Sequence, residues 1–296
     1  PRRLYQSERS TFGPVLSADG SLAVIASTER SGTLDHNLLA YDVNSGECVA
    51  ELWDGDGSNI EPAAFSPVIG DARLLATSST SGYNRPLIWD PRTGERFDLP
   101  LADIPGEITP YGWSPDAKKV ILCQLYQAEY QLYIYDVDSR QTAKLNHPAG
   151  VYGGYFGGAF YTPSGEIYTT WQDSAQPSRL VALDPATGEV RRTVLVAGEA
   201  PAGRAWRSVT FTGANGDTIQ AWLATPDGDG PFPTILHTHG GPTSVMSQYY
   251  APDSQAWLDH GFAFFTVNYH GSTTFGKAFE KSIWGQLGQL EVDDLA

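Results

Sequence analysis

The chain has 296 residues, of which 34 are acidic and 19 are basic, giving a net charge of −15. The acidic balance opposes nucleic-acid binding, which depends on clustered Lys and Arg, and the 31 Gly and 20 Pro with a single Met oppose a long helical bundle. No apolar run reaches the roughly 18 residues of a membrane span, so we expect neither a nucleic-acid nor a membrane partner.

The chain starts at Pro1, without a Met and without the apolar segment of a secretory signal. We therefore expect a cytoplasmic location, although a signal that was removed or that lies upstream stays open. Cys48 and Cys123 are the two cysteines. A chain of this size does not need a disulfide for its stability, so we expect two reduced and partly buried thiols.

Two sequence marks recur with one period over the first 196 residues. The first is an apolar residue followed by Ser or Thr and a turn, and its Ser or Thr recurs at intervals of 49, 48 and 48 residues. The second is an aromatic residue or Leu followed by Asp and a turn, and its Asp recurs at intervals of 48, 46 and 48 residues. The members are Ser17, Ser66, Ser114 and Thr162 for the first mark, and Asp42, Asp90, Asp136 and Asp184 for the second.

The residues between these marks alternate as they do in strands, for example at 22–26, 37–41 and 48–52. Each unit is predicted to contain four short strands joined by tight turns, in which the recurrent Asp bonds the turn backbone. A period of about 40–50 residues with four strands is typical of a β-propeller blade. Four blades are predicted over 11–196, and because propellers have about 4–8 blades we expect further blades before Pro1.

The repeat stops after Gly188, and 197–203 has the composition of a linker. Two domains are therefore predicted, a β-propeller over 1–200 and the start of an α/β domain over 201–296. Alternating runs at 206–211 and 218–223 flank Asn215-Gly216, which predicts an antiparallel hairpin at the start of the second domain.

Strands and helices alternate after this hairpin. The predicted elements are a strand at 233–238, a helix capped by Asp253 and stopped at Gly261, a buried strand at 262–269, and helices at 277–284 and 290–296. The first strand runs into His239-Gly240-Gly241-Pro242. In α/β-hydrolases a strand-to-helix loop of this type supplies a backbone N–H of the oxyanion hole, and its glycines let the backbone approach the substrate carbonyl.

The segment from Thr210 to Ala296 resembles the prolyl oligopeptidase family of serine peptidases (family S9), closest to its acylaminoacyl-peptidase-like branch. The residues that carry the resemblance are His239-Gly240-Gly241-Pro242, Gly261-Phe262-Ala263, Asn268-Tyr269-His270-Gly271-Ser272-Thr273, Phe275-Gly276, Phe279, Trp284-Gly285 and Asp293-Asp294. His270 departs from the family pattern, which usually has Arg there, so the loop-ordering role of that Arg is open in this chain.

The resemblance implies a mainly β protein, in which a β-propeller precedes the N-terminal part of an α/β-hydrolase domain and restricts access to a Ser-Asp-His site. It implies a serine peptidase that hydrolyses short peptides or acyl-peptides through an acyl-enzyme, with a peptide substrate, no cofactor and a homo-oligomeric state left open. Gly241 and Gly240 are the implied oxyanion donors, through their backbone N–H groups, and His239 shapes the loop.

The catalytic triad is not recognisable in this sequence. Gly-x-Ser-x-Gly, the turn that exposes the nucleophile, does not occur in the 296 residues, and in this fold the nucleophile, acid and base follow the next strand. The strand at 233–238 would also be left with an open apolar edge, which natural sheets avoid. We therefore expect the chain to be the amino-terminal part of a longer peptidase and to be inactive by itself.

Two other functions stay open. His237 and His239 would project to one face of a strand, which is compatible with a metal hydrolase, but the remaining histidines have no ligand-like spacing and we predict no metal. The chain could also be a propeller-based peptide or protein binding module with a degenerate hydrolase domain.

Several other features have a structural interpretation that we weigh against a functional one. The loop 54–59 lacks the spacing of a calcium loop and is expected to be a solvated turn between blades. The Gly-aromatic run 152–158 is expected to allow tight blade packing rather than to line a substrate path. Asp293 and Asp294 are expected to be solvated on a terminal helix. Arg204 and Arg207, near the domain junction, could bind a peptide terminus or serve the linker.

Overall fold

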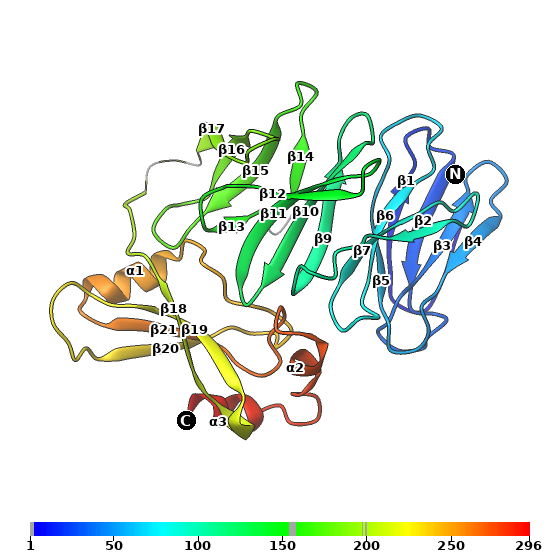
Figure 1. Ribbon diagram of the computed structural model, residues 1–296. Coiled ribbons are helices and arrows are strands. Elements are labelled where there is room, and N and C mark those ends of the chain that lie inside the picture. The colour runs from blue at the N-terminus through cyan, green and yellow to red at the C-terminus, as the bar shows by residue number, and fades with distance from the viewer. Residues whose placement is uncertain (1–2, 154–157, 197, 199) are drawn as a thin grey trace.

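The structure is a computed structural model that describes residues 3–153, 158–196, 198 and 200–296. The described residues form five β-sheets that follow one another along the chain, and Figure 1 shows the first four side by side, from blue to green. The fifth sheet and the helices, drawn from yellow to red, lie beside them at the lower left.

The first four sheets are the predicted repeat units. Each of the first three is an antiparallel meander of four strands in chain order. Their strands are β1 (Thr11–Leu16), β2 (Leu22–Ser27), β3 (Asn37–Asp42) and β4 (Cys48–Leu52); β5 (Ile60–Phe65), β6 (Leu74–Ser78), β7 (Arg85–Trp89) and β8 (Arg96–Asp98); and β9 (Glu107–Trp113), β10 (Lys119–Tyr126), β11 (Glu129–Asp136) and β12 (Gln141–Lys144). The prediction of four strands per unit is confirmed for these three units.

The fourth sheet has one strand more. Its members are β13 (Val151–Tyr152), β14 (Ala159–Tyr161), β15 (Ile167–Gln172), β16 (Arg179–Leu183) and β17 (Val190–Val196). Both β13 and β14 pair with β15, so the first strand of this unit is divided in two. Of the Gly-aromatic run at 152–158, the residues 154–157 lie outside the described residues.

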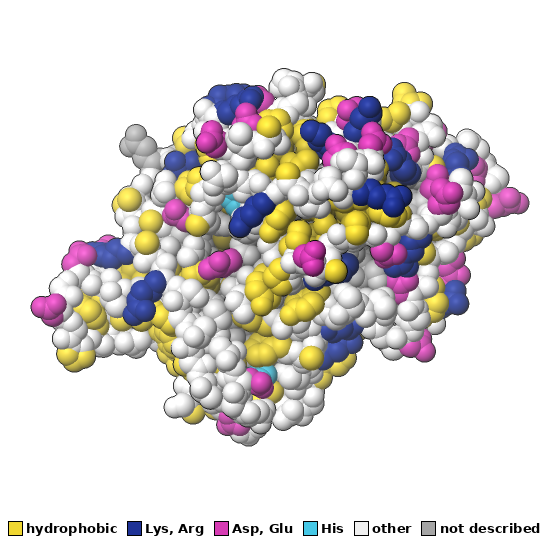
Figure 2. Space-filling model, viewed as in Figure 1, with side chains coloured by type: hydrophobic (Ala, Val, Ile, Leu, Met, Phe, Trp, Pro, Cys, Tyr) yellow, Lys and Arg dark blue, Asp and Glu magenta, His cyan; other side chains and the backbone are white. Residues whose placement is uncertain are grey.

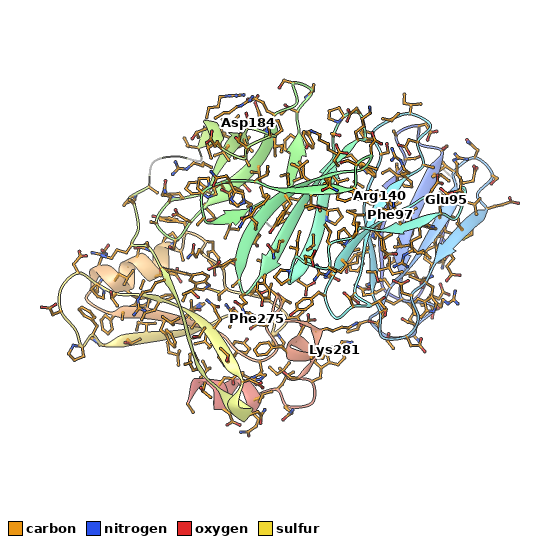
Figure 3. The ribbon with its side chains drawn as sticks, in the orientation of Figure 1. Glu95, Phe97, Arg140, Asp184, Phe275 and Lys281 are labelled. Atoms are coloured by element: carbon orange, nitrogen blue, oxygen red, sulfur yellow. The ribbon has the colours of Figure 1, made fainter. Side chains whose placement is uncertain are left out.

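Neighbouring sheets pack face to face through shared apolar clusters. Buried residues from the first and second sheets form one cluster, those from the second and third form another, and those from the third and fourth form a third. Polar contacts join the same faces: the Trp113 indole N–H donates to the Ala64 carbonyl oxygen at 3.0 Å. The Arg140 guanidinium lies 4.6 Å from the ring centre of Phe97, and Figure 3 shows the two side chains together.

The recurrent Asp bonds its own turn, as the sequence predicts. Asp184 Oδ1 accepts the backbone N–H groups of Ala186 and Thr187 at 2.8 and 2.9 Å. These hydrogen bonds lower the pKa of Asp184 to about 2. The equivalent Asp42 and Asp90 each accept two N–H groups in the same way.

The fifth sheet has the order β18-β19-β21-β20. Its strands are β18 (Arg207–Thr212), β19 (Thr218–Ala224), β20 (Thr234–Thr238) and β21 (Ala263–Asn268). β18 and β19 form the predicted hairpin, and the turn η1 (Ala214–Gly216) holds Asn215 at φ 60°. β20 and β21 are parallel, which places the loop after β20 beside the loop after β21. Within the described residues β20 is an edge strand.

Three short helices accompany this sheet: α1 (Pro252–Asp259), α2 (Lys277–Lys281) and α3 (Leu290–Leu295). The prediction that Asp253 caps α1 is wrong, because the helix begins at Pro252 with Ala251 as its cap and Asp253 lies in the first turn. A Pro fits the first helical position since no N–H is needed there. α2 also ends earlier than predicted, at Lys281. No helix in the described ranges is long and apolar enough to cross a bilayer.

The fifth sheet and its helices bond directly to the blades. The Ala128 N–H, in the turn between β10 and β11, donates to Thr274 Oγ1 at 3.1 Å. The Lys277 backbone N–H donates to the Gly82 carbonyl oxygen at 2.9 Å, and the Trp206 N–H donates to Ser174 Oγ at 2.8 Å. Hydrogen bonds therefore connect the blades to the fifth sheet and its helices.

We expect Leu87→Ala to lower the free energy of unfolding by about 2–5 kcal/mol, because Leu87 is fully buried between the first two sheets and the substitution leaves a cavity. Leu34→Ala is the matched control, since Leu34 is 76% exposed, and its effect should stay within about 0.5 kcal/mol. Urea unfolding measures both. Equal effects would contradict the packing described here.

Candidate active site

The loop His239-Gly240-Gly241-Pro242 follows β20 directly. Gly241 has φ 138°, and a Cβ at this position would lie 2.9 Å from the Thr243 nitrogen, so no other residue fits without strain. A Cβ at Gly240 would meet no atom within 4 Å. Both glycines are exposed, and in the part of the chain that the structure describes neither backbone N–H has a hydrogen-bond partner.

His239 is packed beneath these two glycines. Its ring stacks on Tyr269 with centroids 4.5 Å apart and planes 16° apart. Nδ1 lies 3.1 Å from the Gly240 carbonyl oxygen, which can only accept, and Nε2 lies 2.9 Å from Ser272 Oγ. Burial lowers the pKa of His239. The ring is therefore neutral at neutral pH and carries its proton on Nδ1, while the Ser272 hydroxyl beside Nε2 donates to the Tyr269 carbonyl oxygen at 2.6 Å.

Asn268, at the end of β21, holds the chain that follows the glycine loop. Its Oδ1 accepts the Met246 N–H at 2.7 Å, and its Nδ2 donates to the Met246 carbonyl oxygen at 3.0 Å. The Trp222 indole N–H donates to the same carbonyl at 2.7 Å. Asn268 is fully buried. This role of Asn268 was not predicted, although a polar residue at the end of an apolar strand could have suggested it.

Asp294 is not solvated, which corrects the sequence expectation. Its side chain is completely buried and accepts the backbone N–H groups of His270 and Ala214 at 2.7 and 2.8 Å. The His270 Nδ1 lies 2.7 Å from Asp294 Oδ2, and its Nε2 lies 3.1 Å from Asp217 Oδ2. Asp293 is exposed, as expected. His270 thus joins α3 to the turn of the β18–β19 hairpin.

A cavity of about 330 Å³ lies between the blades and a wall formed by Thr243, Thr273 and α2. We call it the interface cavity; its lining includes Tyr83, Glu107, Thr243, Thr273, Lys277, Glu280 and Lys281, of which Lys281 is labelled in Figure 3. Burial raises the pKa of Glu107 to about 7 and also raises that of Glu280. Burial lowers the pKa of Lys277, whose Nζ donates to Ser79 Oγ at 3.1 Å.

The other candidate residues have structural partners. His237 Nδ1 lies 2.9 Å from Thr266 Oγ1, and no cluster of three His, Cys, Asp or Glu that could hold a metal occurs among the described residues. Arg204 is paired with Asp259 at 2.7 Å and with Asp227 at 3.2 Å, so two carboxylates already occupy its guanidinium.

The structure also places Arg207 and the acidic loop 54–59. Arg207 is exposed on β18. Asp54, in the acidic loop, is mostly buried and paired with Arg96, so this position of the loop is not solvated. On the face drawn in Figure 2, acidic and basic side chains are interspersed over the blades and no single basic patch covers them.

The sequence profile of the prolyl oligopeptidase family matches residues 249–296. Dipeptidyl-peptidase 5 of Porphyromonas endodontalis is 29% identical over 113 residues, which make up 36% of this chain and 16% of that protein. Acylamino-acid-releasing enzyme 2 of Oryza sativa subsp. japonica is 40% identical over 62 residues, which make up 21% of this chain and 8% of that protein. The matched segments are a small part of these curated relatives.

Solved structures match almost the whole chain. A puromycin hydrolase has a TM-score of 0.79 at 22% identity, over 99% of this chain and 46% of that chain. A puromycin-hydrolyzing peptidase of Mycobacterium tuberculosis has a TM-score of 0.75 at 18% identity, over 99% and 46%. The likeness shows the fold, β-propeller blades followed by the first part of an α/β-hydrolase domain, and this confirms the fold predicted from the sequence. The chain spans about half the length of these neighbours.

We expect Glu107→Gln to remove part of the pH dependence of stability. The ordinary pKa of 4.5 applies to the unfolded chain and about 7 to the folded one, so the folded protein binds the extra proton between these values. The contribution of Glu107 to stability is thus full below pH 4.5 and is lost as the pH rises to about 7.

The unfolding free energy of Glu107→Gln, relative to the original chain, should therefore rise between pH 4.5 and 7 and stay level above that. Denaturant unfolding across this range measures the difference. Glu95→Gln, at an exposed position labelled in Figure 3, serves as the control and should give a flat difference. A flat difference for both variants would show that Glu107 is not desolvated.

Proposed function

We propose that the chain forms part of a serine peptidase of the prolyl oligopeptidase family, whose profile matches residues 249–296, and that it supplies part of the oxyanion hole of that enzyme. The donors are the backbone N–H groups of Gly241 and Gly240. The observation that carries this proposal is that both N–H groups are exposed and unpartnered within the described residues, on a loop that is fixed from beneath by His239.

The proposed chemistry needs donors that are in place before the reaction. When a nucleophile attacks a carbonyl, negative charge develops on the oxygen, and fixed N–H groups stabilise it without reorganising. Gly241 reaches its position at φ 138°, which only Gly adopts without strain. His239 acts as a neutral support for the loop, not as the base, because the base follows the nucleophile in this fold.

The nucleophile is proposed to lie in a part of the gene product that this chain does not include. Gly-x-Ser-x-Gly does not occur here, and the solved neighbours are about twice as long as the matched segment. The reaction is proposed to be hydrolysis of a short peptide or acyl-peptide through an acyl-enzyme. We also propose a domain boundary near residue 200, since β17 ends at Val196 and β18 begins at Arg207.

The substrate is proposed to be a peptide that reaches the glycine loop from the interface cavity. Thr243, two residues after Gly241, lines this cavity together with side chains of the blades such as Tyr83. The Lys277 backbone N–H donates a hydrogen bond to the carbonyl oxygen of Gly82, in the turn between β6 and β7 of the second blade. A blade wall this close to the loop would limit the size of the substrate.

Fluorophosphonate labelling of the full gene product tests the proposed function. We expect labelling at a Ser in a Gly-x-Ser-x-Gly sequence beyond Ala296, with Asp and then His further on, and no loss of activity with a chelator. A gene product that ends at Ala296 or lacks that Ser, and that is not labelled, would favour a binding module. Inactivation by chelators would favour a metal hydrolase that uses His237 and His239.

Gly241→Ala tests the oxyanion donor in the same full gene product. We expect kcat/KM to fall by about 10²–10³-fold, because the new Cβ displaces the loop and its N–H from the carbonyl oxygen. The control is Gly112→Ala, since Gly112 has no positive φ and its Cβ would come no closer than 4.0 Å to another residue. A folded Gly241→Ala enzyme with unchanged kcat/KM would refute the assignment.

A further inference from the structure

The segment 268–272, which we call the anchor segment, contacts the glycine loop and the chain that follows it. Asn268 bonds both backbone groups of Met246. The Tyr269 hydroxyl donates to the His239 carbonyl oxygen, and its ring stacks on the His239 ring. Ser272 Oγ lies 2.9 Å from His239 Nε2. The orientation of His239 therefore depends on where the anchor segment lies.

His270 belongs to the same segment but makes its contacts elsewhere. Its backbone N–H and its Nδ1 both lie 2.7 Å from Asp294 Oδ2 on α3. Its Nε2 lies 3.1 Å from Asp217 Oδ2 in the hairpin turn. From α2, the ring of Phe279 stacks on the imidazole at 4.5 Å. His270 thus ties the anchor segment to three elements.

The buried carboxylate of Asp294 is the main hydrogen-bond partner of His270. Its carboxylate is completely buried, so it requires hydrogen-bond donors in fixed positions. Besides His270, the Ala214 N–H donates to it at 2.8 Å. Gly213 leaves the room that this approach needs, since a Cβ there would lie 2.6 Å from Asp294 Oδ1. Removing the His270 ring would leave a buried carboxylate with too few donors, and the elements around it would shift.

We propose that His270 is a positioning residue for the oxyanion loop. It fixes the anchor segment against Asp294 and Asp217, and through Tyr269 and Ser272 it sets the orientation of His239 and of the glycines that follow. That this positioning serves catalysis rests on the proposed function. The dependence of the His239 orientation on His270 is a property of this chain and can be measured without a nucleophile or a substrate.

The test uses the imidazole ¹⁵N resonances of the whole chain labelled at its six histidines. We expect His270→Gln to shift the Nδ1 and Nε2 resonances of His239, because the donors of Gln sit on one nitrogen, whereas Asp294 and Asp217 face two different ring nitrogens of His270. His270→Arg should return them close to their original positions, because a guanidinium has donors for both Asp294 and Asp217. Asp294→Asn should shift the His239 resonances in the same way as His270→Gln.

The control is His260→Gln, at an exposed residue after α1, which should remove only its own resonances. A purely structural His270 would lower the resistance to urea and leave the His239 resonances of the folded protein unchanged. That result in His270→Gln, or in Asp294→Asn if His270→Gln does not fold, would overturn the proposal. A positive result together with a gene product that fluorophosphonate does not label would refute the proposed function alone.

Discussion

The geometry of the candidate site depends on one buried side chain, that of Asn268. Buried backbone groups must find partners, and Asn268 satisfies both the N–H and, together with Trp222, the carbonyl of Met246. The chain between the glycine loop and α1 has no regular secondary structure, so these hydrogen bonds take the place of a sheet or helix ladder. Because Asn268 ends β21, they fix the loop to the most buried strand of the fifth sheet.

The segment after Asn268 carries this constraint to the blades. The Thr273 N–H donates to the Ser244 carbonyl oxygen at 2.9 Å. The next residue, Thr274, accepts the Ala128 N–H from a blade turn at 3.1 Å. Thr273 therefore bonds the chain that follows the glycine loop, and the next residue, Thr274, bonds a blade. A rotation of the blades relative to the fifth sheet would have to strain or break these hydrogen bonds.

The parts of this structure that depend on local sequence could be predicted. The blade period, the hairpin at Asn215 and the glycine loop arise from turn chemistry and alternation within a few residues. Asp294 was predicted wrongly because its partners, His270 and Ala214, are distant in the sequence and meet it only in the folded chain. The interface cavity was not predicted for the same reason, since Glu107 and Thr243 come from different sheets and loops.

The glycine loop uses its carbonyl oxygens and its N–H groups differently. The Gly240 carbonyl oxygen is occupied by His239 Nδ1, and the Pro242 carbonyl accepts the Ser244 N–H. Pro242 itself has no N–H to contribute. The carbonyl oxygens of His239, Gly240 and Pro242 each face a donor, whereas the N–H groups of Gly240 and Gly241 have no acceptor among the described residues. Water can satisfy them in the free protein, and an oxygen atom that bears more charge than water would be bound more strongly at the same place.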